Sequence, residues 1–163
     1  MMKTAIYPGT FDPITFGHID VIKKSLKIFD RVIIATTDNI NKSYYFSIQE
    51  RLLIIKNSLF RDLKLKKKKI IAVPFDTLTI DLCKKYNATV IIRGLRAVSD
   101  FEYEFQLAGM NKKLDSSIET MFLMSDVENQ IISSKFVKEI SKLGGNINKF
   151  VTKSTVKMLK NKF

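Results

Sequence analysis

Residues 7–18 (YPGTFDPITFGH) carry the one histidine of the chain, His18, directly behind a short apolar run. The run predicts a strand, Pro-Gly a tight turn, and Gly17-His18 the start of a helix. Glycine lets a backbone approach a ligand closely, and free N–H groups at a helix N-terminus favour anions. The segment contains neither a G-x-G-x-x-G fingerprint nor a P-loop. We therefore interpret His18 as an anion-site residue, and the alternative is an ordinary surface histidine.

Two arginines form a second candidate group, because Arg93 and Arg96 follow the apolar run Thr89–Ile92. Guanidinium groups suit phosphate recognition, since they offer several N–H donors in a fixed plane. The alternative is that both are surface arginines in a loop. Further along, Ser133 or Ser134 is expected to cap a helix, and a capping serine can also face an anion.

Strand-like and helix-like segments alternate along the chain and would position these residues. Strands are expected at residues 4–7, 31–36, 69–74, 89–92 and 120–124. Helices are expected at residues 17–29, 47–59, 79–86, 99–114, from 133 or 134 to 143, and 152–161. Capping boxes are expected at Ser47 with Glu50 and at Ser99 with Glu102, and Gly144-Gly145 would stop the fifth helix.

This alternation predicts an α/β fold: a Rossmann-like five-stranded parallel sheet with helices on both faces. The strands are continuous apolar runs, as buried parallel strands should be. Ligands of such sheets bind at the carboxyl ends of the strands. We therefore expect the site among residues 8–18, 36–42, 75–79, 93–104 and 125–135.

Composition limits the class of protein. The chain has 163 residues, which predicts one domain over 1–163, and a net charge of +12, which attracts polyanions. The single cysteine, Cys83, excludes a disulfide framework and fits a reducing compartment, so a cytoplasmic location is expected. No apolar run approaches the ~18 residues of a membrane helix, so no membrane partner is expected. The charge alone leaves a basic nucleic-acid-binding module as an alternative, although no recognition-helix, RRM or zinc-finger pattern supports specific nucleic-acid binding.

Two short motifs resemble the signatures of an enzyme superfamily, and three longer stretches resemble one family within it. Thr15 to His18 is similar to the T-x-G-H signature of the nucleotidylyltransferase superfamily, and Ile132 to Lys135 to its I-S-S-x element. The stretches 5–20 (AIYPGTFDPITFGHID), 91–111 (IIRGLRAVSDFEYEFQLAGMN) and 122–139 resemble the phosphopantetheine adenylyltransferase family. The resemblance covers residues 4–160.

That resemblance implies adenylyl transfer from ATP to 4′-phosphopantetheine, giving dephospho-coenzyme A and pyrophosphate in coenzyme A biosynthesis. His18, Lys42 and Arg93 would be catalytic. The substrate would be bound by Thr10, Lys42, Thr79 and Arg93. ATP would be bound by Thr10, Phe11, His18, Gly94, Leu95, Arg96, Glu104, Asn129, Gln130, Ile131, Ile132, Ser133, Ser134 and Lys135. Tyr103 and Asn111 would line the site of the pantetheine arm, and Mg²⁺ would arrive with ATP and need no protein metal site.

The resemblance also implies a homohexamer, and three positions depart from its pattern. Thr77 stands where the family usually has an aspartate, Asn129-Gln130 where it often has an aromatic residue and a hydroxyl, and Lys135 where it has a third serine. We expect altered nucleotide affinity from these departures. A related transferase acting on nicotinamide mononucleotide or a phosphorylated alcohol is the alternative that shares T-x-G-H and I-S-S.

Overall fold

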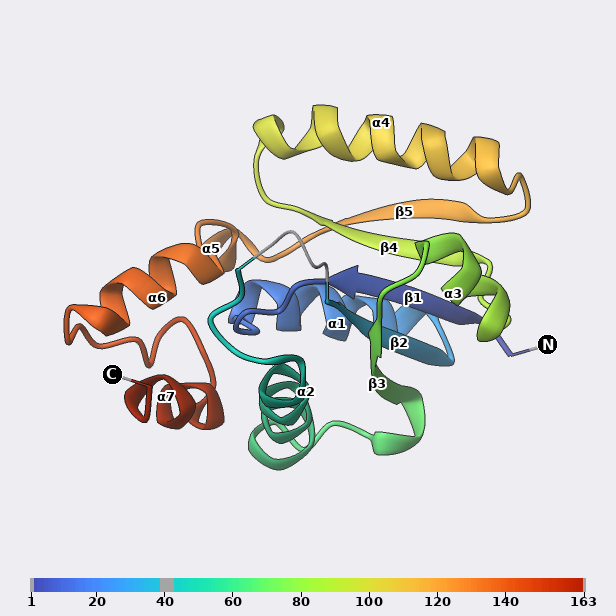
Figure 1. Cartoon of the computed structure of the whole chain (residues 1–163). Coiled ribbons are helices and arrows are strands. Elements are labelled where there is room, and N and C mark those ends of the chain that lie inside the picture. Colours follow the sequence, from blue (N-terminus) through green and yellow to red (C-terminus); the bar gives the residue numbers. More distant parts are fainter. Residues whose placement is uncertain (1, 39–42, 163) are drawn as a thin grey trace.

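Five parallel strands form one sheet in the computed structural model, which describes residues 2–38 and 43–162 (Figure 1). The strands are β1 (Thr4–Gly9), β2 (Arg31–Thr37), β3 (Ile70–Phe75), β4 (Val90–Leu95) and β5 (Glu119–Met124). Their order in the sheet is β3-β2-β1-β4-β5, and every neighbouring pair is parallel. The predicted parallel sheet is therefore confirmed.

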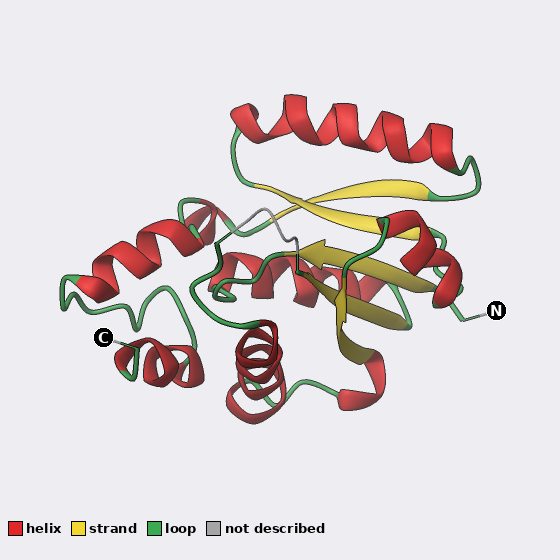
Figure 2. Ribbon diagram, viewed as in Figure 1, coloured by secondary structure: helices red, strands yellow, loops and turns green. Residues whose placement is uncertain are grey.

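Helices connect the strands and cover the sheet (Figure 2). They are α1 (Phe16–Ile28), α2 (Ile48–Lys56), α3 (Thr79–Lys85), α4 (Val98–Leu114), α5 (Val127–Gln130), α6 (Ser134–Lys142) and α7 (Lys153–Lys160). A π-helical turn, Asn57–Asp62, extends α2, and a short 3-10 turn, Lys67–Lys69, precedes β3. In Figure 1, α4 runs alongside β5, and α7 lies next to α2.

The two faces of the sheet bury two separate sets of apolar side chains. Along β1 and β2, Tyr7 and Ile34 pack on the face covered by α1 and α2, whereas Ile6 and Ile33 pack on the face covered by α3. This division follows from the alternation of side chains along a strand. On β5, Phe122 contacts Phe101 of α4 with ring centroids 6.1 Å apart. Both faces of the sheet are therefore covered by helices, as expected.

Most helix ends follow the expected signals. Ser47 and Glu50 form the capping box of α2, with Ser47 N donating to Glu50 Oε2 at 2.8 Å. Ser133 caps α6 by accepting from Phe136 N at 3.2 Å. Gly144, with φ of 77°, follows the end of α6 in the left-handed conformation that favours glycine.

The capping box expected at Ser99 and Glu102 was wrong. Helix α4 begins at Val98 with Ala97 as its N-cap, and Asp100 N donates to Ala97 O at 3.0 Å. The helical turn thus closes two residues earlier than the Ser-x-x-Glu pattern indicates. The second helix also differs, because its last turn is π-helical and sets the buried Ser58 hydroxyl 2.7 Å from that of Thr152.

The strand order reverses its direction between β1 and β4. From β1 the chain first builds outward to β2 and β3, and then crosses to β4 and β5 on the other side. A crevice opens at the carboxyl ends of the strands at such a point, because the two connections leave in opposite directions. Gly9 ends β1 and Leu95 ends β4, so the residues that follow them face this crevice.

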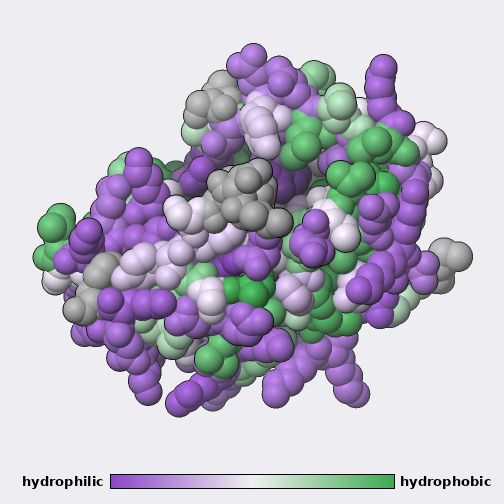
Figure 3. All heavy atoms as spheres, viewed as in Figure 1, coloured by the Kyte–Doolittle hydropathy of each residue, from purple (hydrophilic) through white to green (hydrophobic). Residues whose placement is uncertain are grey.

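The face of the molecule shown in Figure 3 is largely hydrophilic. Figure 3 shows polar and charged side chains over most of the viewed face, with smaller apolar areas between them. Within the described part of the chain, no helix is both long and apolar enough to span a bilayer.

Candidate active site

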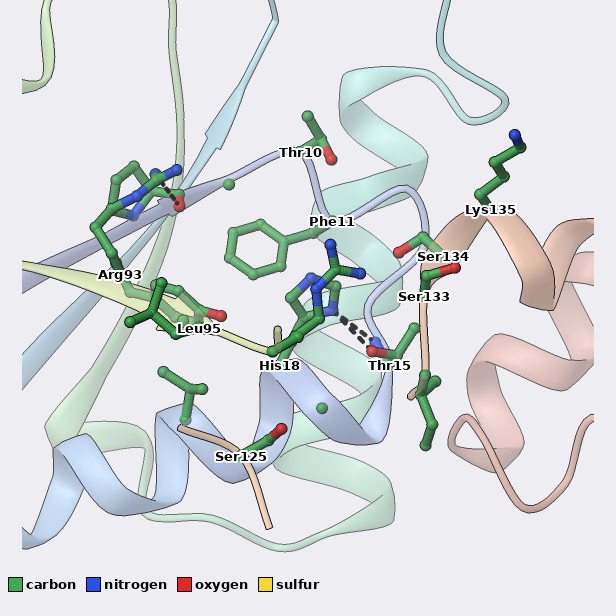
Figure 4. A pocket seen from close by; sticks show the side chains of 18 of the residues that line it. Thr10, Phe11, Thr15, His18, Arg93, Leu95, Ser125, Ser133, Ser134 and Lys135 are labelled. Carbon is green, nitrogen blue, oxygen red and sulfur yellow. Dashed lines mark hydrogen bonds between the residues drawn. The ribbon is translucent and has the colours of Figure 1, made fainter. Parts of the chain in front are cut away.

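A cavity of about 560 Å³ lies at the carboxyl ends of β1 and β4, where the strand order reverses. Its wall is built by the turn after β1, the first turn of α1, the end of β4 and the start of α6 (Figure 4). The predicted site residues that line it are Thr10, Phe11, His18, Arg93, Gly94, Leu95, Arg96, Ile132, Ser133, Ser134 and Lys135. Residues 7–21, 93–96 and 132–136, which are distant from one another in the sequence, therefore meet in one hollow.

The His18 side chain is fixed by the residue that caps its own helix. Its Nδ1 accepts a hydrogen bond from Thr15 N at 3.1 Å and lies 3.0 Å from Thr15 Oγ1. An imidazole nitrogen that accepts an N–H carries no proton, so the proton of the neutral ring sits on Nε2. The Phe11 ring, which is fully buried, packs edge-on against the imidazole at a centroid distance of 5.1 Å.

The imidazole is neutral at physiological pH. Burial, and then the positive charge of Arg96, lower the pKa of His18 to about 4. Protonation of Nδ1 would also break the hydrogen bond from Thr15 N. At neutral pH His18 therefore supplies an uncharged N–H donor on Nε2 to the cavity, rather than a cation or a general base.

This low pKa predicts that acid weakens the fold through His18. In the unfolded chain His18 has its ordinary pKa of 6.5, so the unfolded state gains a proton first as the pH falls toward 4. The His18 contribution to the free energy of unfolding is complete above pH 6.5 and is lost as the pH falls to about 4. We expect a loss of about 2 kcal/mol after allowance for partial exposure of the ring. Calorimetry of wild type and His18→Gln should show that the free energy of unfolding of wild type falls relative to that of the variant as the pH is lowered over this range. A constant difference between the two free energies would contradict the prediction.

Arg93 is held by a carboxylate and a carbonyl group. Its Nε and Nη2 donate to the two carboxylate oxygens of Glu104, each at 2.6 Å, and its Nη1 donates to Pro8 O at 3.2 Å. A guanidinium group has five N–H bonds, so two remain for a ligand, one on each Nη. Glu104 is buried behind Arg93 and does not itself line the cavity. The structure thus shows Glu104 orienting Arg93, and its approach to the nucleotide stays a prediction.

The start of α6 presents backbone N–H groups to the cavity. The first N–H groups of a helix have no partner within it, and the helix dipole makes this end favourable for anions. The two serine hydroxyls are already engaged, because Ser133 Oγ accepts from Phe136 N and Ser134 Oγ donates to Pro13 O at 2.7 Å. The structure therefore gives the N-cap role to Ser133, whose O–H can still donate at this wall beside the backbone N–H groups.

Two comparisons with known proteins bear on the family of this chain. Residues 6–140 match the family model described as cytidylyltransferase-like. A phosphopantetheine adenylyltransferase from Pelagibacter ubique (strain HTCC1062) is 68% identical over 163 residues, 100% of this chain and 99% of that protein. A second, from Paracoccus denitrificans (strain Pd 1222), is 48% identical over 151 residues, 93% of this chain and 92% of that protein.

The chain belongs to the phosphopantetheine adenylyltransferase family.

Solved structures agree on the fold of this family. The Plasmodium falciparum nicotinic acid mononucleotide adenylyltransferase complexed with NaAD superposes with a TM-score of 0.70 at 19% identity, over 99% of this chain and 96% of that one. A bifunctional NMN adenylyltransferase/ADP ribose pyrophosphatase from Francisella tularensis gives 0.74 at 14% identity, over 99% of this chain and 49% of that one. At these identities the likeness shows the fold alone.

Several residues expected from the family motifs lie away from the cavity wall. Asn129 Nδ2 donates to Asp20 Oδ2 at 2.6 Å, Gln130 Nε2 donates to Ser125 O at 3.2 Å, and the Ile131 side chain is exposed. Thr79 is the first residue of α3, which follows the edge strand β3 in the chain. In the sheet, β3 lies two strands away from β1, where the strand order reverses. Lys42 lies outside the described residues.

The lack of a side chain at Gly17 allows α5 to pack closely against the start of α1, in addition to allowing a ligand to approach. A Cβ at Gly17 would lie 3.0 Å from Asn129 O, which is a backbone atom that cannot rotate away. We predict that Gly17→Ala displaces the α5 segment and raises the KM for ATP about tenfold. Gly109→Ala on α4 is the matched control, since its Cβ would meet nothing within 4 Å. Equal KM values in steady-state assays of the two variants would contradict the prediction.

Sequence reasoning missed three polar residues around the cavity. Ser125 lines it with a buried hydroxyl that has no hydrogen-bond partner among the described residues. Asp12 accepts from Tyr45 N and Phe46 N, each at 2.9 Å. Arg51 is fully buried in α2. One signal was available for Arg51: it is a charged residue inside the apolar periodicity of a helix.

Proposed function

We propose that this protein transfers the adenylyl group of ATP to 4′-phosphopantetheine, giving dephospho-coenzyme A and pyrophosphate. One observation carries the proposal: a neutral, fixed His18 shares a single cavity with Thr10, two arginines and the N-terminus of α6. The 68% identity to a named phosphopantetheine adenylyltransferase supports the choice of acceptor. Because the cavity combines cationic groups with N–H donors, it suits the binding of a triphosphate and a phosphate monoester at the same time.

The reaction needs alignment more than it needs proton transfer. A phosphate monoester is largely ionised at neutral pH, so its oxygen can attack the α-phosphorus of ATP without a general base. A new P–O bond forms to the acceptor phosphate, the bond from the α-phosphorus to its bridging oxygen breaks, and pyrophosphate leaves with that electron pair. The protein therefore has to hold the two phosphates in line and stabilise the charge that develops.

Each wall of the cavity has a part in this reaction. The Nε2–H of His18 donates to the α-phosphate, where charge accumulates in the transition state. The two remaining N–H bonds of Arg93, together with Thr10, bind the acceptor phosphate. Arg96 and the first N–H groups of α6 bind the β- and γ-phosphates, which become the leaving pyrophosphate.

We propose that Mg²⁺ binds together with ATP and not at a separate site on the protein. Among the described residues there is no group of three or more His, Cys, Asp or Glu side chains that could hold a metal ion. The hydroxyl and cationic groups of the cavity fit a nucleotide that keeps its metal on phosphate oxygens and water. When bound, the ion would reduce the negative charge of the triphosphate.

The decisive assay is pyrophosphate release from MgATP with different acceptors. We expect release with 4′-phosphopantetheine, and at least 100-fold less with nicotinamide mononucleotide at equal concentration. Dephosphorylated pantetheine is the matched control, because it lacks only the attacking phosphate and should give none. Release with nicotinamide mononucleotide alone would move the assignment to the other acceptor class.

We also propose a homohexamer located in the cytoplasm, as is typical of this family. Large apolar side chains are exposed on α4, including Phe105 and Met110, and a free buried thiol at Cys83 suits a reducing compartment. Light scattering after size exclusion tests the assembly: six times the mass of the 18.8 kDa chain is expected, and a monomer would contradict it.

A further inference from the structure

Arg51 of α2 is a fully buried cation that does not line the described cavity. Its Nη1 donates to Thr37 O at 2.7 Å and to Thr10 O at 3.1 Å. Its Nε donates to Phe46 O at 3.1 Å, and its Nη2 forms an ion pair with Asp38 at 2.7 Å. One guanidinium group therefore donates to four separate groups, and it also lies 3.9 Å above the ring centroid of Tyr44.

These acceptors lie around the carboxyl ends of two neighbouring strands. Thr10 follows β1, Thr37 ends β2, and Gly9 pairs with Thr36 in the parallel register. Phe46 belongs to the segment just before α2. A guanidinium group is planar and rigid, so it fixes the spacing between the groups that it binds. Arg51 thus connects the turn after β1 to β2 and to the segment before α2.

A carboxylate secures the same turn from the other side. Asp12 accepts from Phe46 N at 2.9 Å, so both backbone groups of Phe46 are bound, one by Asp12 and one by Arg51. Asp12 also pairs with Lys138 of α6 at 2.9 Å. The turn that carries Thr10 is therefore held between α2 and α6 rather than left free at the strand end.

Stability alone does not explain a buried arginine at this position. Removing a guanidinium group from water costs several kcal/mol, whereas an apolar side chain in the core of α2 would pack without that cost. Its donors are instead aimed at the turn that leads into the cavity wall. We propose that Arg51 is a positioning residue for adenylyl transfer, which acts by fixing the backbone of Thr10 beside His18. This inference rests on the proposed function.

Arg51→Lys tests the proposal, because lysine keeps the charge and loses the planar fork. We expect faster amide hydrogen exchange in residues 9–16 and 43–47, measured without any substrate. We also expect kcat per folded molecule to fall about 100-fold while the KM for ATP stays within threefold, since misalignment affects the reacting geometry more than nucleotide binding. Unchanged exchange in these segments, or a kcat within threefold of wild type, would overturn the proposal.

Two further variants separate positioning from folding. Asp38→Asn removes the half-exposed charged partner of Arg51 and should leave the fold intact, so it replaces Arg51→Lys if that variant does not fold. It should lower kcat about tenfold and raise exchange in the same segments, and wild-type values of both would overturn the proposal. Arg31→Lys, at the opposite end of β2, is the matched control and should change neither.

The two readouts also separate this inference from the proposed function. If wild type transfers no adenylyl group to 4′-phosphopantetheine, the proposed function fails. The exchange measurement, which needs no substrate, still decides whether Arg51 fixes the Thr10 turn.

Discussion

Replacing His18 by alanine is expected to lower kcat for adenylyl transfer about 1,000-fold while the protein stays folded. The variant loses the Nε2–H donor that His18 presents to the cavity, and a single donor to developing charge is worth 100-fold to 1,000-fold. The KM for ATP should change little, because Arg96 and α6 still bind the β- and γ-phosphates. Steady-state pyrophosphate release measures both constants.

Two further substitutions at His18 distinguish a donor from a structural ring. His18→Gln can place an N–H close to the position of Nε2, whereas His18→Asn can replace only the acceptor at Nδ1, which Thr15 N contacts. We expect Gln to recover about tenfold over alanine and Asn to recover nothing. Recovery by Asn alone would show that the contact with Thr15 matters and that the donor does not.

Replacing Arg93 by methionine is expected to damage both stability and activity. It removes two 2.6 Å hydrogen bonds and leaves the buried Glu104 carboxylate without its partner. An unpaired buried charge costs about 3 to 5 kcal/mol, which urea unfolding would detect. The KM for 4′-phosphopantetheine should rise about 100-fold, because the charged donors to the acceptor phosphate are lost.

The double variant Arg93→Met with Glu104→Leu separates these two effects. Replacing both partners by apolar residues removes the unpaired charge, so most of the lost stability should return. The KM for 4′-phosphopantetheine should stay raised, because the double variant still lacks the guanidinium group. If the double variant recovered activity along with stability, Arg93 would serve the fold and not the substrate.

The sheet and its order of elements were predictable because they depend on local patterns. Buried parallel strands are continuous apolar runs, and every expected strand is present, with ends that differ by a few residues. The ends of helices were less certain. At Ser99 the Ser-x-x-Glu pattern suggested a cap, yet Ala97 takes that position, because the chain turns into α4 directly after β4.

The site was predictable where it lies on motifs beside strand ends, as at His18 and Arg93. Pairings between distant residues were not predictable, because they depend on tertiary packing. Nothing in the local sequence indicates that Glu104 holds Arg93, or that Arg51 reaches the carbonyl group of Thr10, 41 residues away. The place of Thr79 was not predictable for the same reason, because the position of β3 at the edge of the sheet follows from the strand order. The expected role of Thr79 in substrate binding stays a prediction.

The most direct test of adenylyl transfer is to follow a radioactive phosphate of ATP into the product. With [α-³²P]ATP and 4′-phosphopantetheine, we expect the label to appear in dephospho-coenzyme A, and we expect [γ-³²P]ATP to label only pyrophosphate. Both outcomes follow from attack at the α-phosphorus inside the cavity of His18 and Arg93. Label from the γ-phosphate in the organic product, or no α-label there, would contradict adenylyl transfer by this protein.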